Sequence, residues 1–141
     1  MRKSLVFALI LVVGCLASCS RPEKIIVKHD GLWKETEMRT TTILNGLTIA
    51  DFSINSPLGR RYFDKNGTGW YEDFSGTQTI NSWSMNADQD RLTINDGNGL
   101  VTDYDILAIN GKSMTLKNSY TTIVSAVLVT IESTTILEQV K

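Results

Sequence analysis

The sequence predicts an all-β domain, an antiparallel up-and-down β-barrel of about eight strands. From residue 31 onward the chain is rich in Thr, Ile, Val, Trp and Tyr, which favour strands. Dipeptides typical of hairpin turns separate these runs: Asn45-Gly46, Asn66-Gly67, Asp96-Gly97, Asn98-Gly99 and Asn110-Gly111. A meander of about eight strands leaves two unpaired edges unless it closes. The alternative is a two-sheet sandwich, but the short connections favour a closed meander.

The expected strands are residues 32–39, 41–44, 47–54, 60–64, 69–74, 77–86, 91–95, 100–109, 113–117 and a closing run at 121–137. The run at 41–44 is short enough to be part of its neighbour. The apolar stretch 123–131 is rich in Val and Ile, so we interpret it as strand despite its length. Because residues 31–141 must supply every strand, we expect short strands and a small interior.

The amino-acid composition argues against several classes of function. The chain has 141 residues, 42% of them hydrophobic, and a formal net charge of −1, which fits one folded domain. A nucleic-acid-binding protein would carry a basic patch, so no nucleic-acid partner is expected. There is one histidine, and both cysteines lie within the first 19 residues, which excludes most familiar zinc and catalytic arrangements. We therefore expect no cofactor.

The N-terminus has the pattern of a secretory signal, with Arg2 and Lys3 before the apolar residues 5–13. Leu16-Ala17-Ser18-Cys19 then resembles the lipobox of bacterial lipoproteins. The resemblance implies cleavage before Cys19 and acylation of that cysteine, for example by palmitate. Cys15 fits the pattern more loosely, because it would leave a shorter apolar segment. The alternatives are an ordinary cleaved signal peptide and an uncleaved membrane anchor.

This interpretation divides the chain into three parts: a signal peptide at 1–18, a lipidated cysteine with a short tether at 19–30, and a barrel domain at 31–141. The resemblance implies a place in the bacterial cell envelope, anchored to the outer membrane and facing the periplasm. The mature chain would keep a single acylated cysteine, so no disulfide could form and stability would come from the core.

Several short motifs of the barrel domain share an order and spacing with a known family. They are Gly31-Leu32-Trp33, residues 62–69, Trp83-Ser84-Met85, residues 90–94, Tyr104-Asp105-Ile106 and residues 110–116. Together they resemble the small lipocalin-like, or calycin-type, domains of bacterial lipoproteins over about residues 31–118. The resemblance implies a barrel that binds a small hydrophobic or amphipathic ligand, and it transfers no catalytic site. The chain after Tyr120 is longer and more apolar than that family's last strand, which leaves the closing strand open.

Aromatic side chains are the candidate ligand-binding residues: Trp33, Phe52, Tyr62, Trp70, Trp83 and Tyr104. Ordinary core packing and cross-strand pairing are the alternative role for them. In lipocalins the tryptophan that matches Trp33 packs across the bottom of the barrel, so the resemblance implies a structural role there. In a regular strand Ile80 and Trp83 lie on opposite faces, so either a bulge intervenes or one of them faces outward.

No motif predicts an enzyme or a metal site. The segment from Asp64 to Thr68 begins like a calcium loop, but the twelfth loop position is Ser75 and the flanks are strands, which favours a tight turn. His29 has no partners in sequence for a zinc site. The sequence therefore predicts a membrane-anchored lipoprotein that binds a small apolar ligand. The alternative is a filled barrel that binds an envelope protein or has a structural role.

Overall fold

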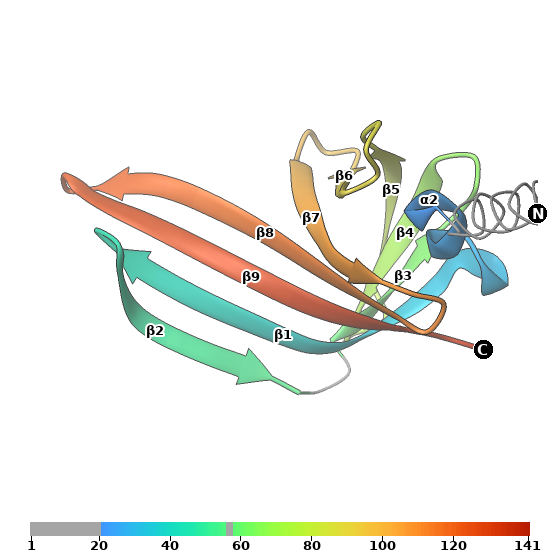
Figure 1. Ribbon diagram of the computed structural model, residues 1–141, viewed down its shortest axis with the longest axis horizontal. Coiled ribbons are helices and arrows are strands. Elements are labelled where there is room, and N and C mark those ends of the chain that lie inside the picture. The colour runs from blue at the N-terminus through green and yellow to red at the C-terminus, as the bar shows by residue number, and fades with distance from the viewer. Residues whose placement is uncertain (1–20, 56–57) are drawn as a thin grey trace, which may run out of the picture.

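The computed structural model describes residues 21–55 and 58–141, and these form nine antiparallel strands of one sheet (Figure 1). The strands are β1 (Leu32–Leu44), β2 (Leu47–Ile54), β3 (Gly59–Phe63), β4 (Thr68–Asp73), β5 (Gln78–Met85), β6 (Arg91–Asn95), β7 (Val101–Ile109), β8 (Ser113–Val124) and β9 (Val127–Gln139). Their order in the sheet is β2-β1-β3-β4-β5-β6-β7-β8-β9, and β1 also pairs with β9. This last pairing closes eight strands into an up-and-down barrel, which confirms the predicted fold class.

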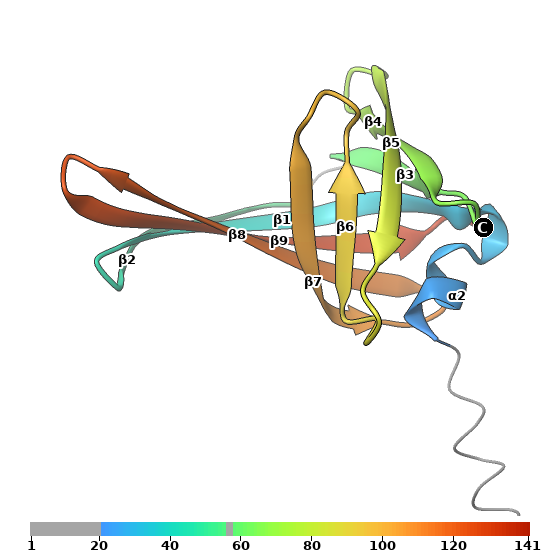
Figure 2. The same ribbon diagram turned by 90° about the horizontal axis from the view of Figure 1, so that it is seen from above.

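Four strands continue beyond the barrel as an extension, which we define as residues 38–54 and 118–133. The far half of β1 pairs with β2 on one side and β9 on the other, and β9 pairs with the far half of β8. Figures 1 and 2 show this four-stranded sheet projecting to one side of the barrel. The expectation of short strands was wrong for β1, β8 and β9, which have 13, 12 and 13 residues.

The expected single run at 121–137 is two strands joined by a hairpin. Ser125 and Ala126 form the turn, with φ of 50° and 65°, and Val124 pairs with Val127. Two-residue hairpins of this kind require positive φ and usually contain Asn or Gly, so Ser-Ala gave no turn signal. The hairpin explains why the chain after Tyr120 is long and apolar: it builds the tip of the extension as well as the closing strand.

Part of the expected tether packs into the barrel. Helix α2 (Pro22–Ile26) and the 3-10 turn η1 (His29–Gly31) lie against one end, which we call the floor. Ile26 is fully buried, and its carbonyl oxygen accepts a hydrogen bond of 2.8 Å from the Trp33 indole nitrogen. Gly31 has φ of +65°, and a Cβ there would lie 2.0 Å from the Phe63 carbonyl oxygen, so only glycine fits.

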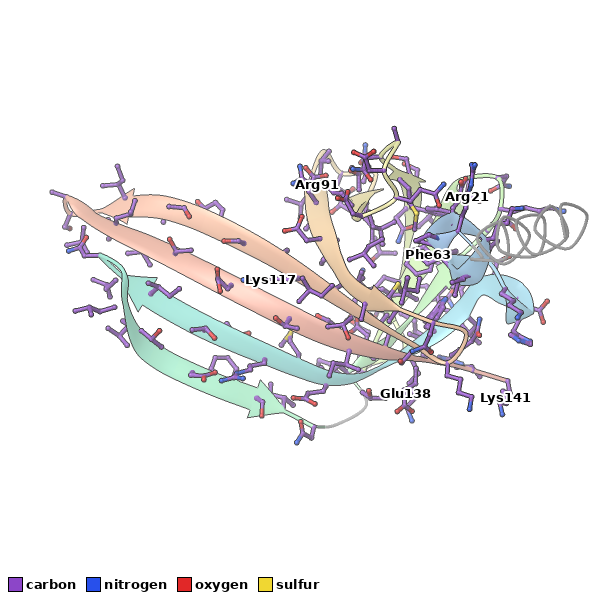
Figure 3. All side chains as sticks on the ribbon, viewed as in Figure 1. Arg21, Phe63, Arg91, Lys117, Glu138 and Lys141 are labelled. Atoms are coloured by element: carbon purple, nitrogen blue, oxygen red, sulfur yellow. The ribbon has the colours of Figure 1, made fainter. Side chains whose placement is uncertain are left out.

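Alternating side chains of the barrel strands point inward and fill its lower half. Phe63 and Trp83 meet edge to face with ring centroids 5.7 Å apart, and Figure 3 shows Phe63 within this crowded interior. The buried apolar side chains are Ile26, Trp33, Phe63, Trp83, Leu92, Ile94, Met114, Leu116 and Leu137. Ile80 is 77% exposed while Trp83 is buried, and β5 pairs regularly with both neighbours, so Ile80 simply faces outward.

The predicted signal peptide, the motif that resembles a lipobox and Cys19 fall within residues 1–20, outside the described residues. Between residues 21 and 141, in the parts that the structure describes, no helix is long and apolar enough to cross a membrane. The barrel, its core and the extension are all built from described residues between 21 and 141.

Replacing Ile26 with alanine should lower the free energy of unfolding by about 3 kcal/mol, because it opens a cavity under Trp33 in a filled floor. Urea unfolding followed by tryptophan fluorescence measures this loss. Ile80→Ala, which removes the same atoms from an exposed position, should change stability by less than about 0.5 kcal/mol. Equal losses in the two variants would show that α2 is not part of the core.

Candidate functional site at the barrel mouth

The end of the barrel opposite α2 is its mouth, and a hollow of about 210 Å³ lies there. The mouth is bounded by the β4–β5 and β6–β7 turns and by the base of the extension. The hollow is lined by Arg61, Tyr71, Thr79, Asn81, Ile94, Asp96, Leu100, Thr102 and Tyr104. These residues come from β3 to β7 and the adjoining β6–β7 turn, so the hollow lies against one wall of the barrel interior.

A buried ion pair forms the polar part of this wall. Arg61 Nε donates a hydrogen bond of 2.6 Å to Glu35 Oε1, and the two side chains are 16% and 6% exposed. Both positions face inward in the alternation of β1 and β3, next to Trp33 and Phe63. An ion pair this far from water is held by geometry, because removing either partner would leave the other charge without compensation.

Two tyrosine rings surround the guanidinium. Arg61 Cζ lies 4.7 Å from the Tyr71 ring centre and 5.7 Å from that of Tyr104, within the range of cation–π attraction. Burial opposes the charge of Arg61, but Glu35 and the tyrosines outweigh it and raise the pKa of Arg61 above its ordinary value. Burial, followed by the nearby Glu35 charge, also raises the pKa of the Tyr71 hydroxyl. The site therefore presents a charged guanidinium beside a neutral phenol.

Arg61 has N–H donors that do not bind Glu35. A guanidinium carries five N–H donors, and Nε is the Arg61 atom that binds Glu35. Its two Nη atoms make no hydrogen bond to another described residue. Neither of them is among the buried atoms that lack a partner, so both remain accessible. Since Arg61 lines the hollow, these donors are available to a molecule that enters the mouth.

Asn81 adds a second polar group from β5. It is 8% exposed and lines the hollow, and its Oδ1 has no hydrogen-bond partner among the described residues. Gly69 lies directly beneath it on β4, where a Cβ would come within 2.8 Å of that oxygen. The close approach is thus possible only above a glycine, and it leaves a polar amide in the wall.

The six aromatic candidates from the sequence do not meet at one site. Tyr104 lies at the mouth, beside Arg61. Trp33 and Trp83 belong to the floor core, and Trp83 Nε1 donates to the Asp64 and Thr68 carbonyl oxygens. The remaining three lie elsewhere: Tyr62 and Trp70 stack on the outer face of the barrel with ring centroids 5.7 Å apart, and Phe52 is 51% exposed on β2, outside the barrel.

Sequence reasoning missed Glu35, Arg61, Tyr71 and Asn81 as a group. Strand alternation was the available signal, because Glu35 follows Trp33 by two residues and Arg61 precedes Phe63 by two. A charged residue in register with a core aromatic on each of two neighbouring strands indicates an inward-facing pair. Their partnership could not be read from spacing, because the β1–β3 register depends on the whole barrel.

A larger hollow of about 310 Å³ lies at the floor end, outside the barrel, between the β7–β8 turn and the C-terminus. It is lined mostly by exposed polar residues, among them His29 and Lys112. No group of three or more potential metal-ligating His, Cys, Asp or Glu residues occurs in residues 21–55 or 58–141. Asp64 accepts a hydrogen bond of 2.9 Å from the Asn66 backbone N–H in the β3–β4 turn.

No protein-family model matches this sequence. No curated protein matches it either. Among solved structures, the chain is similar to apocrustacyanin C2, with 10% sequence identity and a TM-score of 0.48. The similarity covers 77% of this chain and 59% of that one, so this chain matches less than two thirds of the apocrustacyanin chain. Eight antiparallel strands in up-and-down order, closed by the first and last, make the barrel lipocalin-like.

Replacing Arg61 with methionine should lower the free energy of unfolding by about 3 kcal/mol, because the buried Glu35 carboxylate loses its partner. The double variant Glu35→Leu/Arg61→Met should recover most of that loss, since no uncompensated charge remains. Arg39→Met, which breaks an exposed ion pair with Asp51, should change stability little. Urea unfolding of the four proteins would contradict this account if the double variant were less stable than Arg61→Met.

Proposed function

We propose that this protein is a bacterial envelope lipoprotein, anchored through Cys19, that holds a small amphipathic molecule at the mouth of its barrel. The observation that carries the proposal is the Arg61 guanidinium, which lines the hollow and keeps donors unused after binding Glu35. The aromatic and aliphatic side chains around it supply apolar contact. A few convergent polar groups within an apolar wall are typical of small-molecule sites.

The size of the hollow limits the ligand. Drug-sized ligands occupy pockets of roughly 300–1,000 Å³. The mouth offers about 210 Å³, and the core below it is filled. The site therefore suits a small molecule, or one end of a longer molecule whose remainder stays outside the barrel.

The charges at the mouth define the polar end of the ligand. Arg61 offers N–H donors, but Glu35 already neutralises its charge, and Asp96 adds a carboxylate to the lining. A fully anionic group would meet that carboxylate without a free positive charge to balance it. An uncharged acceptor, such as a hydroxyl, an ester or an amide carbonyl, fits the site better.

Arg21, which follows the proposed anchor by two positions, and the mouth lie at opposite ends of the barrel. Arg21 precedes α2 at the floor, whereas the mouth lies at the other end of the barrel, beside the base of the extension (Figures 2 and 3). One residue, Ser20, separates Cys19 from Arg21, so their Cα atoms are at most about 7 Å apart. An acylated Cys19 would hold the floor close to the membrane and turn the mouth away from it.

A second candidate function is that of a protein-interaction module. The filled lower half of the barrel and the exposed apolar side chains of the extension favour it. Neither observation depends on a ligand at the mouth, so the two functions can be tested separately.

Thr79→Trp should abolish ligand binding, because its side chain faces the mouth and the larger ring would fill the hollow. The matched control is Ile80→Trp, the next residue of β5, which faces outward and should bind as the unmodified protein does. Native mass spectrometry of the chain from Ser20 onward, incubated with a bacterial envelope lipid extract, measures the bound mass. Adducts that persist in Thr79→Trp, or their absence in all three proteins, would argue against the mouth as a site for these lipids.

Cys19→Ala should prevent incorporation of an alkyne-tagged palmitate and release the protein from the membrane fraction, because the thiol is the proposed acylation site. The measurement is metabolic labelling of the full chain expressed in a Gram-negative host. Cys15→Ala is the matched control and should be labelled and membrane-bound. Labelling that follows Cys15 instead, or membrane attachment of both variants, would overturn the assignment.

A further inference from the structure

The extension has an inner face, which we define as the side continuous with the barrel interior. Register and alternation assign Met38, Thr40, Thr42, Leu44, Leu47, Ala50, Phe52, Ile54, Asn118, Tyr120, Thr122, Val124, Val127, Val129, Ile131 and Ser133 to it. None of these described residues is charged, and most are apolar. Phe52 is 51% exposed, Tyr120 62% and Ile131 38%, so the face is open to solvent.

The charges of the extension lie on its outer face, where each forms an ion pair. Arg39 binds Asp51 across β1 and β2, and Glu132 Oε2 lies 3.0 Å from the Nζ of Lys117, the residue of β8 just before the extension. The inner face is therefore the uncharged face of a sheet one layer thick, and the outer face carries the charges and, near the tip, the exposed pair Ile123 and Leu128. A sheet with one apolar face is stable only when that face is buried against another layer.

We propose that the inner face packs against the inner face of a second copy of this chain, as a two-layered sandwich. The absence of charge on this face makes it compatible with itself, since no like charges would meet across a twofold axis. Paired sheets in proteins lie about 10 Å apart with their strands nearly aligned, which suits two open faces of this kind.

The position of the barrel wall limits which twofold axis can relate the two copies. Strands β3 to β7 rise on the same side of the sheet as the inner face (Figures 1 and 2). A twofold axis parallel to the strands would bring both barrels to the same end, where they would collide. The axis must run across the strands, so that each extension lies over the other and the barrels stand at opposite ends.

This axis gives a specific set of contacts. Ala50, Thr42, Ile131 and Tyr120 form the middle row of the face, because each is in register with the next. An axis along that row places each of these residues opposite its own copy. The rows on either side of this middle row exchange places between the two copies. Phe52 of one copy therefore lies opposite Leu47 of the other, and both side chains are apolar.

Two polar residues at the β8 edge of the face match in the same way. The row next to the barrel contains Asn118, and the row next to the tip contains Thr122. The axis places these two polar side chains opposite each other at the free edge of β8. Apolar groups thus meet apolar groups along β2, and polar groups meet polar groups along β8. On the two central strands the axis places Thr40 opposite Leu44 and Ser133 opposite Val129, so that each hydroxyl meets an aliphatic side chain.

The face is large enough for a specific dimer. Four strands about 4.8 Å apart and a length of eight residues at about 3.3 Å each give roughly 500 Å² of face in projection. The two copies together would bury about 1,000 Å², the lower bound for a specific protein interface. Arg21, the first described residue, lies at the other end of the molecule from the tip of the extension (Figure 3).

Sedimentation velocity of the chain from Ser20 onward tests the proposal, because this part contains the whole barrel and extension. The unmodified protein should form dimers with a dissociation constant in the micromolar range or below. Ile131→Lys and Ile131→Glu should each be monomeric, since each puts like charges opposite one another at the axis. An equimolar mixture of the two should restore a heterodimer, which no misfolded variant would do.

Ser119→Lys is the control, because it adds the same charge to the outer face beside Glu132 and should leave the dimer intact. In the full chain, Thr42→Cys should form a disulfide-linked dimer on oxidation, and Thr41→Cys, its outward-facing neighbour, should not. Monomers at every concentration, or dimers that survive Ile131→Lys, would overturn the proposal. So would a monomer that carries bound lipid on this face, or a full chain whose Thr42→Cys variant does not cross-link.

Discussion

The pairing of β1 with β9 is the constraint on which the rest of this structure depends. It runs from Trp33 opposite Gln139 to Leu44 opposite Val129, with one register shift between Glu35 and Glu37. Its first part closes the barrel, and its second part continues into open solvent as the centre of the extension. One ladder of hydrogen bonds thus produces both a closed interior and an exposed face, because the inward side of a strand stays on the same side of the sheet along its length.

The interior is filled where the ladder closes and open where the ladder leaves the barrel. Trp33, Phe63 and Trp83 pack together with Ile26 in one buried cluster at the floor. Above them, the Glu35–Arg61 pair replaces apolar packing with a polar layer, and the small hollow begins there. A buried ion pair is weak evidence for stability, since apolar groups of similar size often pack as well. Its position between the filled core and the hollow is consistent with the role in ligand recognition proposed above.

Much of the fold could be predicted from local sequence. The Asn-Gly and Asp-Gly dipeptides mark turns through a backbone preference that needs no tertiary context, and β2 and β6 were predicted with their observed bounds. The Ser125-Ala126 turn carries no such preference, so the hairpin that builds the extension was missed. Arg61 and Glu35 were missed for a different reason, because their partnership depends on register between strands. Helix α2 is too short to show periodicity, and burial of Ile26 against the floor stabilises it.

Residue-resolved amide hydrogen exchange of the chain from Ser20 onward tests the central claim most directly: the β1–β9 ladder is continuous from the barrel into the extension. The account predicts that amides of β1 and β9 in residues 40–44 and 129–133 are strongly protected, as those of the barrel half of the same strands are. Exchange of these amides at the rate of an unstructured chain, with a protected barrel, would contradict it. The sheet would then end at the mouth, and the inner face would not exist as a surface.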